Sequence, residues 1–223
     1  MPYAKEDCRR CGNCCRNGGP ALHDQDRHLV TDGHLHLDQL ITIRKGEKAV
    51  SPAAGAPKTI THELIKIQGR GGGWDCLFFN PAEQSCTTYD HRPLECHLFL
   101  CRIPAALHAI MEKELLQRRD LLHPNDPVRE IMERHDQQCP PAALFELLKT
   151  PHEDNHAAIL SELNRLVRLD MSIRQEAVSK FTISAGLELF LFGRPHFILL
   201  APHGFSPRQG PNGLEVVHRP PQV

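Results

Sequence analysis

Nine cysteines are the residues of this sequence with the most evident chemistry, and eight of them lie within the first 101 positions. In chain order these eight are Cys8, Cys11, Cys14, Cys15, Cys76, Cys86, Cys96 and Cys101. Cysteines at this density either form disulfides or bind a soft metal ion. The odd total argues against a complete disulfide framework. All eight are therefore candidate metal ligands.

The first run, Cys8-x2-Cys11-x2-Cys14-Cys15, carries a thiol at every third position. In a loop, this spacing turns successive sulfurs toward one centre. Cys8, Cys11 and Cys14 therefore suit a 4Fe-4S cluster with a distant fourth ligand, or a tetrahedral zinc ion. We expect Cys15 to serve a second centre or none, because adjacent side chains in an extended segment diverge.

The later cysteines belong to a second segment of the same region. Cys96 and Cys101 lie five positions apart, which on a regular helix separates them by about 140°. Either a helix breaks there or the two thiolates serve different centres. Eight thiolates make two sets of four, so one or two metal centres are possible.

The segment before Cys96 reads like the start of a helix. Pro93 suits the first helical position, which places Cys96 in the first turn, where the helix dipole favours a thiolate. Arg92 adds positive charge beside this site. An ordinary helix start with a buried cysteine is the plainer interpretation, and the nearby cysteines weaken it.

These motifs carry a resemblance to a known family. The first cysteine run, followed by Trp74-Asp-Cys76-Leu-Phe-Phe and Cys86-x2-Tyr89-x2-Arg92-Pro93-x2-Cys96, resembles the zinc- or iron-chelating cysteine-cluster family (YkgJ-like proteins) over residues 5–101. The resemblance implies metal binding by the cysteines, with zinc and iron as alternatives. A similar cluster occurs in flagellin lysine N-methylases, which are longer enzymes, and no methyl-donor site is evident here.

Other potential ligands have plainer interpretations. Cys139 lies outside the cysteine pattern and is expected to be a free thiol. His34 and His36 would face one way on a strand, but an exposed pair is the simpler interpretation. His152-Glu153-x2-His156 matches a zinc-protease pattern, yet Thr150-Pro151-His152-Glu153 is explained as a helix-capping box. We expect His152 and His156 to bind no metal.

Composition limits the remaining possibilities. The chain has 223 residues, 40% of them hydrophobic and 5% aromatic, with a formal net charge of −1 and a pI near 6.9. This balance does not favour nucleic acid or an acidic membrane surface as a partner. No signal peptide or membrane-spanning run is apparent, so a cytoplasmic protein is expected, where reduced thiols bind metal rather than pair.

The hydrophobic pattern changes from irregular to helical after Cys101. Residues 1–20 read as a loop, 61–68 as a short strand, and 35–43 as either strand or helix. Helical spacing recurs over 107–122, 128–132, 144–148 and 159–178, and 187–192 is an apolar helix or strand. From Pro202 onward, Pro and Gly predict a poorly packed tail.

Together, these observations predict a mainly α protein: a loop-rich, metal-stapled N-terminal module with a small helical C-terminal assembly. The expected regions are 1–102 for the cysteine module, 103–201 for the helices and 202–223 for a flexible tail. The favoured function is an iron–sulfur protein with an electron-transfer or redox role and an unknown redox or protein partner, because Cys-x2-Cys-x2-Cys is ferredoxin-like. A zinc-stabilised interaction module without catalysis, and a cluster-dependent methyltransferase-like enzyme, are the alternatives.

Overall fold

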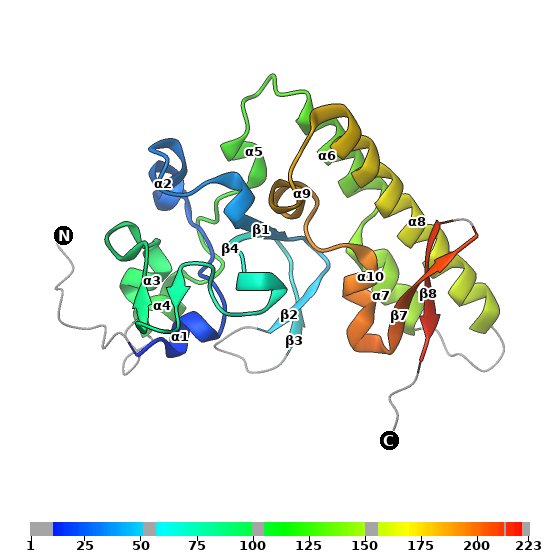
Figure 1. Ribbon diagram of the computed structural model, residues 1–223, viewed down its shortest axis with the longest axis horizontal. Helices are drawn as coiled ribbons and strands as arrows, with labels where there is room; N and C mark the ends of the chain where they lie inside the picture. The colour runs from blue at the N-terminus through cyan, green and yellow to red at the C-terminus, as the bar shows by residue number, and fades with distance from the viewer. Residues whose placement is uncertain (1–10, 51–56, 100–104, 150–155, 212, 220–223) are drawn as a thin grey trace.

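The computed structural model describes residues 11–50, 57–99, 105–149, 156–211 and 213–219. About 51% of the described residues are helical, and the strands form two-stranded antiparallel pairs. The prediction of a mainly α protein is therefore confirmed. In Figure 1 the irregular N-terminal half lies on the left and the longer C-terminal helices on the right.

Short elements make up the N-terminal half. Its helices are α1 (Asn13–Arg16), η1 (Asp24–Asp26), α2 (Arg27–Thr31), η2 (Leu37–Gln39), η3 (Arg70–Gly72), η4 (Tyr89–His91) and α3 (Leu94–Leu98). Its strands are β1 (Leu40–Ile43), β2 (Lys48–Val50), β3 (Pro57–Thr59), β4 (Leu64–Ile67), β5 (Phe79–Asn80) and β6 (Ser85–Cys86). The strands pair as β1–β4, β2–β3 and β5–β6.

The C-terminal half is mainly helical, and its helices include the longest one among the described residues. They are α4 (Ala105–Ile110), α5 (Arg118–Leu121), α6 (Val128–Gln138), α7 (Pro141–Lys149), α8 (His156–Phe181), α9 (Ala185–Phe192), α10 (His196–Leu200) and η5 (Ala201–His203). The last strands are β7 (Phe205–Gly210) and β8 (Gly213–His218). The periodicity predictions for 128–132, 144–148 and 159–178 are confirmed by α6, α7 and α8.

The predicted helix over 107–122 is wrong as a single element. It divides into α4 and α5, with Glu112 and Glu114 at positive φ between them. The intervening segment pairs instead with an earlier part of the chain, since Leu116 N–H donates to Leu22 O at 3.1 Å and Asp24 N–H donates to Glu114 O at 2.8 Å. Long-range backbone pairing replaces the local helical hydrogen bonds here.

The expectation of a poorly packed tail is also wrong where the structure describes it. Phe205 to His218 form the β7–β8 hairpin, in which Phe205 pairs with His218 and Gly210 with Gly213. Phe205 and Val216 are buried within a hydrophobic cluster that includes Leu163 and Leu200, and β8 packs against α8. The hairpin lies beside the N-terminal half of α8 in Figure 1.

A second and larger hydrophobic cluster joins the two halves of the molecule. It combines Leu22, Leu40 and Ile65 from the N-terminal half with Ile173 and Phe190 from α8 and α9. The cysteine region and the helices thus share one core. The domain limits at 102 and 201 stay predictions, but the larger cluster extends across the first limit and the smaller cluster across the second.

Candidate metal centre

Two of the predicted ligands are brought together by a single helical turn. Cys14 and Cys15 lie in α1, and their Sγ atoms are 3.8 Å apart. The expectation that Cys15 points away assumed an extended chain. In a helix, consecutive side chains are about 100° apart rather than opposite, so both sulfurs can face one side.

A glycine shapes the start of this turn. Gly12 precedes α1 with φ of 76°, a left-handed conformation that costs glycine little. A Cβ built on Gly12 would lie 2.4 Å from Phe79 Cζ, so the ring fills the space that a side chain would need. Phe79 itself is buried at the start of β5, and it fixes the position of the turn that carries Cys14 and Cys15.

Cys76 and Cys86 approach from the segment around β5 and β6. The Cys76 N–H donates to Cys15 O at 2.7 Å, which ties the two cysteine segments together directly. Cys76 is buried, and Gly69 forms a β-bridge to it across the glycine-rich turn. Cys86 pairs with Phe79 in the β5–β6 hairpin.

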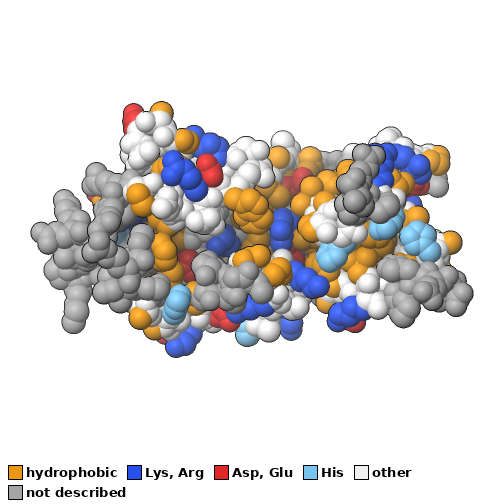
Figure 2. All heavy atoms as spheres, turned by 90° about the horizontal axis from the view of Figure 1, so that it is seen from below, with side chains coloured by type: hydrophobic (Ala, Val, Ile, Leu, Met, Phe, Trp, Pro, Cys, Tyr) orange, Lys and Arg blue, Asp and Glu red, His pale blue; other side chains and the backbone are white. Residues whose placement is uncertain are grey.

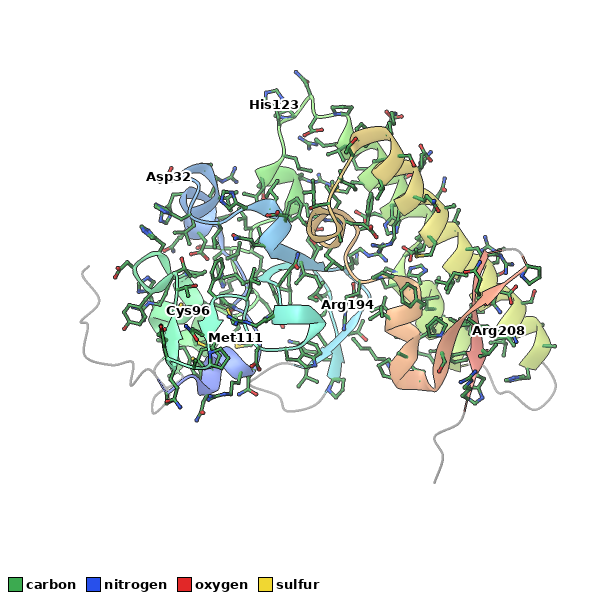
Figure 3. All side chains as sticks on the ribbon, viewed as in Figure 1. Asp32, Cys96, Met111, His123, Arg194 and Arg208 are labelled. Carbon is green, nitrogen blue, oxygen red and sulfur yellow. The ribbon has the colours of Figure 1, made fainter. Side chains whose placement is uncertain are left out.

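Cys96 comes from α3, whose start is held by two carboxylates. Asp26 Oδ1 accepts a hydrogen bond from Leu94 N–H at 2.8 Å, and Glu95 Oε2 accepts one from Ala21 N–H at 2.7 Å. Pro93 is the N-cap, one position earlier than predicted, and Cys96 lies in the first turn as expected. Figure 3 shows Cys96 on this short helix, at the left of the molecule.

The thiols influence one another electrostatically. The hydrogen bond from Cys15 lowers the pKa of Cys14 to about 6, and the same interaction raises the pKa of Cys15. Burial raises the pKa of Cys76 and that of Cys96, and each is raised further by the charges of Cys86 and Cys14. The dipole argument for a thiolate at Cys96 is thus outweighed by burial. Without a cation, this cluster holds little negative charge.

Two cationic side chains act on the cluster. Arg92 stacks over the Tyr89 ring, 3.6 Å from its centroid, and its charge helps to lower the pKa of Cys14. The predicted positive charge is therefore present. Lys66 of β4 is the second cation, and Cys76 and Cys96 are among the charges that act on its ammonium group. Sequence reasoning missed Lys66, whose one available signal is a lysine inside the apolar strand Leu64–Ile67.

The donor set fits a thiophilic metal ion, although the ligands are not yet gathered around one point. Among the residues that the structure describes, no group of three or more His, Cys, Asp or Glu side chains converges to hold a metal. However, two thiolates bound to one tetrahedral zinc at about 2.3 Å lie about 3.8 Å apart. The Cys14–Cys15 pair already has this spacing. Metal binding would draw Cys76, Cys86 and Cys96 toward the pair.

The remaining predicted ligands divide into two groups. Cys11 is exposed at the surface, and its membership of the centre stays a prediction. Cys8 and Cys101 lie outside the described residues. His152, which is expected to bind no metal, lies outside them as well. The prediction that Cys8, Cys11 and Cys14 are ligands of one centre therefore stays a prediction.

Cys139 is separate from the cysteine cluster. It follows α6 and is fully buried in the larger hydrophobic cluster, where burial raises the pKa of its thiol to about 12. Its carbonyl oxygen accepts hydrogen bonds from Arg44 at 3.0 Å and from His196 at 3.1 Å, when His196 Nε2 carries the proton. Its surroundings are those of a structural thiol.

Two of the histidines considered as possible ligands make aromatic contacts with other histidines. His34 stacks on His91 with ring centroids 3.5 Å apart, so it forms an exposed aromatic pair with a residue that the sequence did not single out. His156 begins α8 and lies 5.8 Å from His218, ring centroid to ring centroid.

The cysteine pattern is matched by a family model. The model named CxxCxxCC, with the description "Putative zinc- or iron-chelating domain", matches residues 7–139, which is more than half of the chain. This chain belongs to the CxxCxxCC family. The match extends beyond the expected 5–101 and includes α4, α5, α6 and Cys139. The chain is therefore a metal-binding protein of a zinc- or iron-chelating type.

Other comparisons add nothing to this family assignment. No match was found among curated proteins or among solved structures. Within the described part of the chain, every helix is too short or too polar to span a bilayer. Figure 2 shows basic side chains scattered among apolar and polar ones over the face seen from below.

Proposed function

We propose that this member of the CxxCxxCC family holds a zinc or iron ion that takes Cys14 and Cys15 together as two of its ligands. The observation that carries the proposal is the 3.8 Å separation of their sulfur atoms. Two of Cys76, Cys86 and Cys96 would supply the remaining two ligands of a tetrahedral ion, because the charges of Cys76 and Cys86 act on Cys15 and that of Cys14 acts on Cys96. The bound ion would let these thiols ionise and would link α1, the β5–β6 hairpin and α3.

The chemistry of the site supports a soft-metal role over a thiol-redox role. Burial raises the pKa of Cys76 and of Cys96, so neither is a reactive thiolate by itself. A bound cation removes this barrier because it displaces the thiol protons and neutralises the repulsion among the sulfurs. Thiolate ligands of this kind select zinc and iron over hard cations.

An iron–sulfur cluster with a redox role is the second candidate. The five thiols of the cluster (Cys14, Cys15, Cys76, Cys86 and Cys96) exceed the four that one tetrahedral ion needs. Arg92 and Lys66 supply positive charge to this site. A two-iron cluster, in which each iron takes two cysteines, would accept the pair. A four-iron cluster takes one thiolate for each iron and would use only one of Cys14 and Cys15. A cytoplasmic location suits either centre, because thiols stay reduced there.

Metal and acid-labile sulfide analysis of the full-length protein, purified without oxygen, tests these alternatives. Cys14→Ser and Cys15→Ser are the informative variants, and Cys139→Ala is the matched control away from the cluster. A shared ion predicts that either serine variant loses the metal while the control retains it. Brown protein with sulfide indicates a cluster, and colourless protein with zinc indicates a zinc site. Equal metal content in both serine variants and the unsubstituted protein would contradict the proposal.

A further inference from the structure

Lys66 lies inside β4, a strand in which every second side chain is buried. In β4, Ile65 and Ile67 are buried on the core face, whereas Lys66 alternates to the other face and is half-buried. Lys66 pairs with Ile41 of β1 on one side and with Ala21 on the other. Backbone on both sides thus fixes where the lysine side chain starts.

Glu95 is the carboxylate whose charge acts most strongly on the Lys66 ammonium group, and it already has other partners. Glu95 accepts a hydrogen bond from Ala21 N–H at 2.7 Å, and its other oxygen lies 3.5 Å from His23 Nε2. None of the ion pairs among the described residues includes Lys66. The charges that attract its ammonium group are those of Glu95, Cys96 and Cys76.

A partly buried ammonium group without an ion pair is costly in a folded protein. An apolar residue would satisfy the strand pattern of Leu64, Ile65 and Ile67 at no such cost. The lysine is explained if its neighbours carry negative charge in the working protein. Four thiolates around a divalent ion leave a net charge of about −2, which a nearby ammonium group offsets.

We propose that Lys66 is the charge-compensating residue of the metal centre, a side chain that binds no metal but stabilises the negatively charged thiolate complex. This inference rests on the proposed function. It assigns to β4 a role in setting how many ionised thiolates the centre can keep. The cysteine pattern of the family does not contain this position.

The test uses the full-length protein and two metal ions, Zn²⁺ measured by competition with a chelator and Co²⁺ measured by its thiolate charge-transfer absorption. Lys66→Met removes the charge and keeps an unbranched side chain that is one atom shorter, and Lys66→Arg keeps the charge. Lys45→Met, at an exposed lysine beyond β1, is the matched control. We expect Lys66→Met to weaken Zn²⁺ binding by about tenfold or more and to reduce the Co²⁺ thiolate absorption.

The stability of the metal-free protein distinguishes a role of the Lys66 charge at the metal centre from a role of Lys66 in the fold alone. We expect metal-free Lys66→Met to unfold at the same or a higher denaturant concentration than the unsubstituted protein, because an apolar side chain replaces a half-buried charge. Lys66→Arg and Lys45→Met should bind Zn²⁺ nearly as the unsubstituted protein does. If Lys66→Met does not fold, Lys66→Gln replaces it in every measurement.

Three outcomes would overturn the proposal. Unchanged Zn²⁺ affinity in the neutral variant would remove Lys66 from the centre and leave the metal function intact. Equal weakening in Lys66→Arg and Lys66→Met would show that shape rather than charge matters. If the unsubstituted protein binds neither Zn²⁺ nor Co²⁺, the proposed function and the role of Lys66 fail together.

Discussion

At the scale of single residues, the most unusual feature outside the cysteines is a sealed polar network. His135, Asp170 and His196 are fully buried, and Arg44 and Arg174 nearly so. His135 Nε2 donates to Asp170 Oδ1 at 2.6 Å, because Arg44 donates to its Nδ1 atom at 3.1 Å and so fixes the tautomer. Asp170 Oδ2 accepts from the His196 N–H at 2.9 Å. The network joins Arg44, which directly follows β1, with α6, α8 and α10.

This network predicts a loss of stability in acid. Burial lowers the pKa of His135 to about 3 and that of His196 to about 4. Below pH ~6.5 the unfolded chain takes up protons at both residues while the folded protein does not, so the free energy of unfolding falls as the pH falls toward about 4. Each histidine contributes about 1 kcal/mol per pH unit in this window.

Denaturant unfolding of His135→Gln between pH 7 and 5 checks this prediction. The variant removes one of the titrating groups, so its stability should depend on pH less steeply than that of the unsubstituted protein. His123→Gln is the control, at an exposed histidine at the edge of the molecule in Figure 3. A slope in His135→Gln equal to that of the control would show that His135 titrates in the folded protein as it does in the unfolded one.

At the scale of elements, two short pieces of chain determine where the cysteines lie. One is the turn at Gly12, and the other is the start of α3, where Asp26 accepts from Leu94 N–H and from His23 N–H at 2.9 Å. Neither piece contains enough apolar surface to hold its own shape. Each depends on a specific contact with a distant segment.

Gly12→Ala adds only one methyl group but should weaken metal binding markedly. The new methyl group meets the Phe79 ring and the left-handed φ becomes unfavourable, so α1 must shift. We expect a fall in Zn²⁺ affinity of about tenfold or more, measured by chelator competition. Gly33→Ala is the control for the left-handed conformation alone, since it also has positive φ but open space around it. Similar losses in both variants would rule out the contact with Phe79 as the cause.

Asp26→Ala should loosen α3. It removes the side-chain acceptor of Leu94 N–H, and the loss of such a helix cap costs about 1 kcal/mol, with more expected here because Asp26 is buried. Asp32→Ala, at an exposed position, is the control. Thermal unfolding of both variants measures the effect, and equal melting temperatures would contradict the capping role.

The sequence predicted elements well where local periodicity decides them. The buried positions of α8, such as Ile159, Leu163 and Leu166, follow the spacing of one helix face, so the helix was recognisable. The break between α4 and α5 was not, because it depends on pairing with residues about 90 positions earlier, including the hydrogen bond between His23 Nδ1 and Lys113 O. The cysteines were identified by type, but their grouping depends on the backbone conformation. The role proposed for Lys66 depends on the neighbours of β4, which the sequence does not give.

At the scale of the whole molecule, the shared core determines what metal removal does. β1 and β4 belong to the larger hydrophobic cluster through Leu40, Ile65 and Ile67, so they do not depend on metal for burial. The prediction of a metal-dependent N-terminal module therefore applies most directly to α1, β5, β6 and α3.

Hydrogen exchange on metal-free and metal-loaded protein tests this division. We expect metal removal to increase exchange in α1, the β5–β6 hairpin and α3, and to leave β1, β4 and α8 protected. Uniform loss of protection across the chain would show that the core itself needs the metal. No change at any amide would contradict the metal-dependent module.

The C-terminal hairpin should contribute to overall stability. Val216 is buried against α8, and Val216→Ala should cost about 1–2 kcal/mol in the free energy of unfolding by leaving a cavity. Val178→Ala, at a valine that is 38% exposed on α8, is the matched control and should change stability little. Equal effects of the two variants on denaturant unfolding would show that the hairpin is poorly packed, as the sequence predicted.

The adjacent sulfurs of Cys14 and Cys15 have a consequence for toxic metalloids. Trivalent arsenic is soft and forms covalent bonds to two neighbouring thiols, with release of water from a reagent such as phenylarsine oxide. Two Sγ atoms 3.8 Å apart on one helical turn form such a dithiol without rearrangement of the backbone. Metal-free protein should therefore be retained on an arsenical resin and released by a competing dithiol, whereas Cys15→Ser should bind less tightly. Exposure to arsenite would then displace or exclude the native ion from the very pair that makes the site.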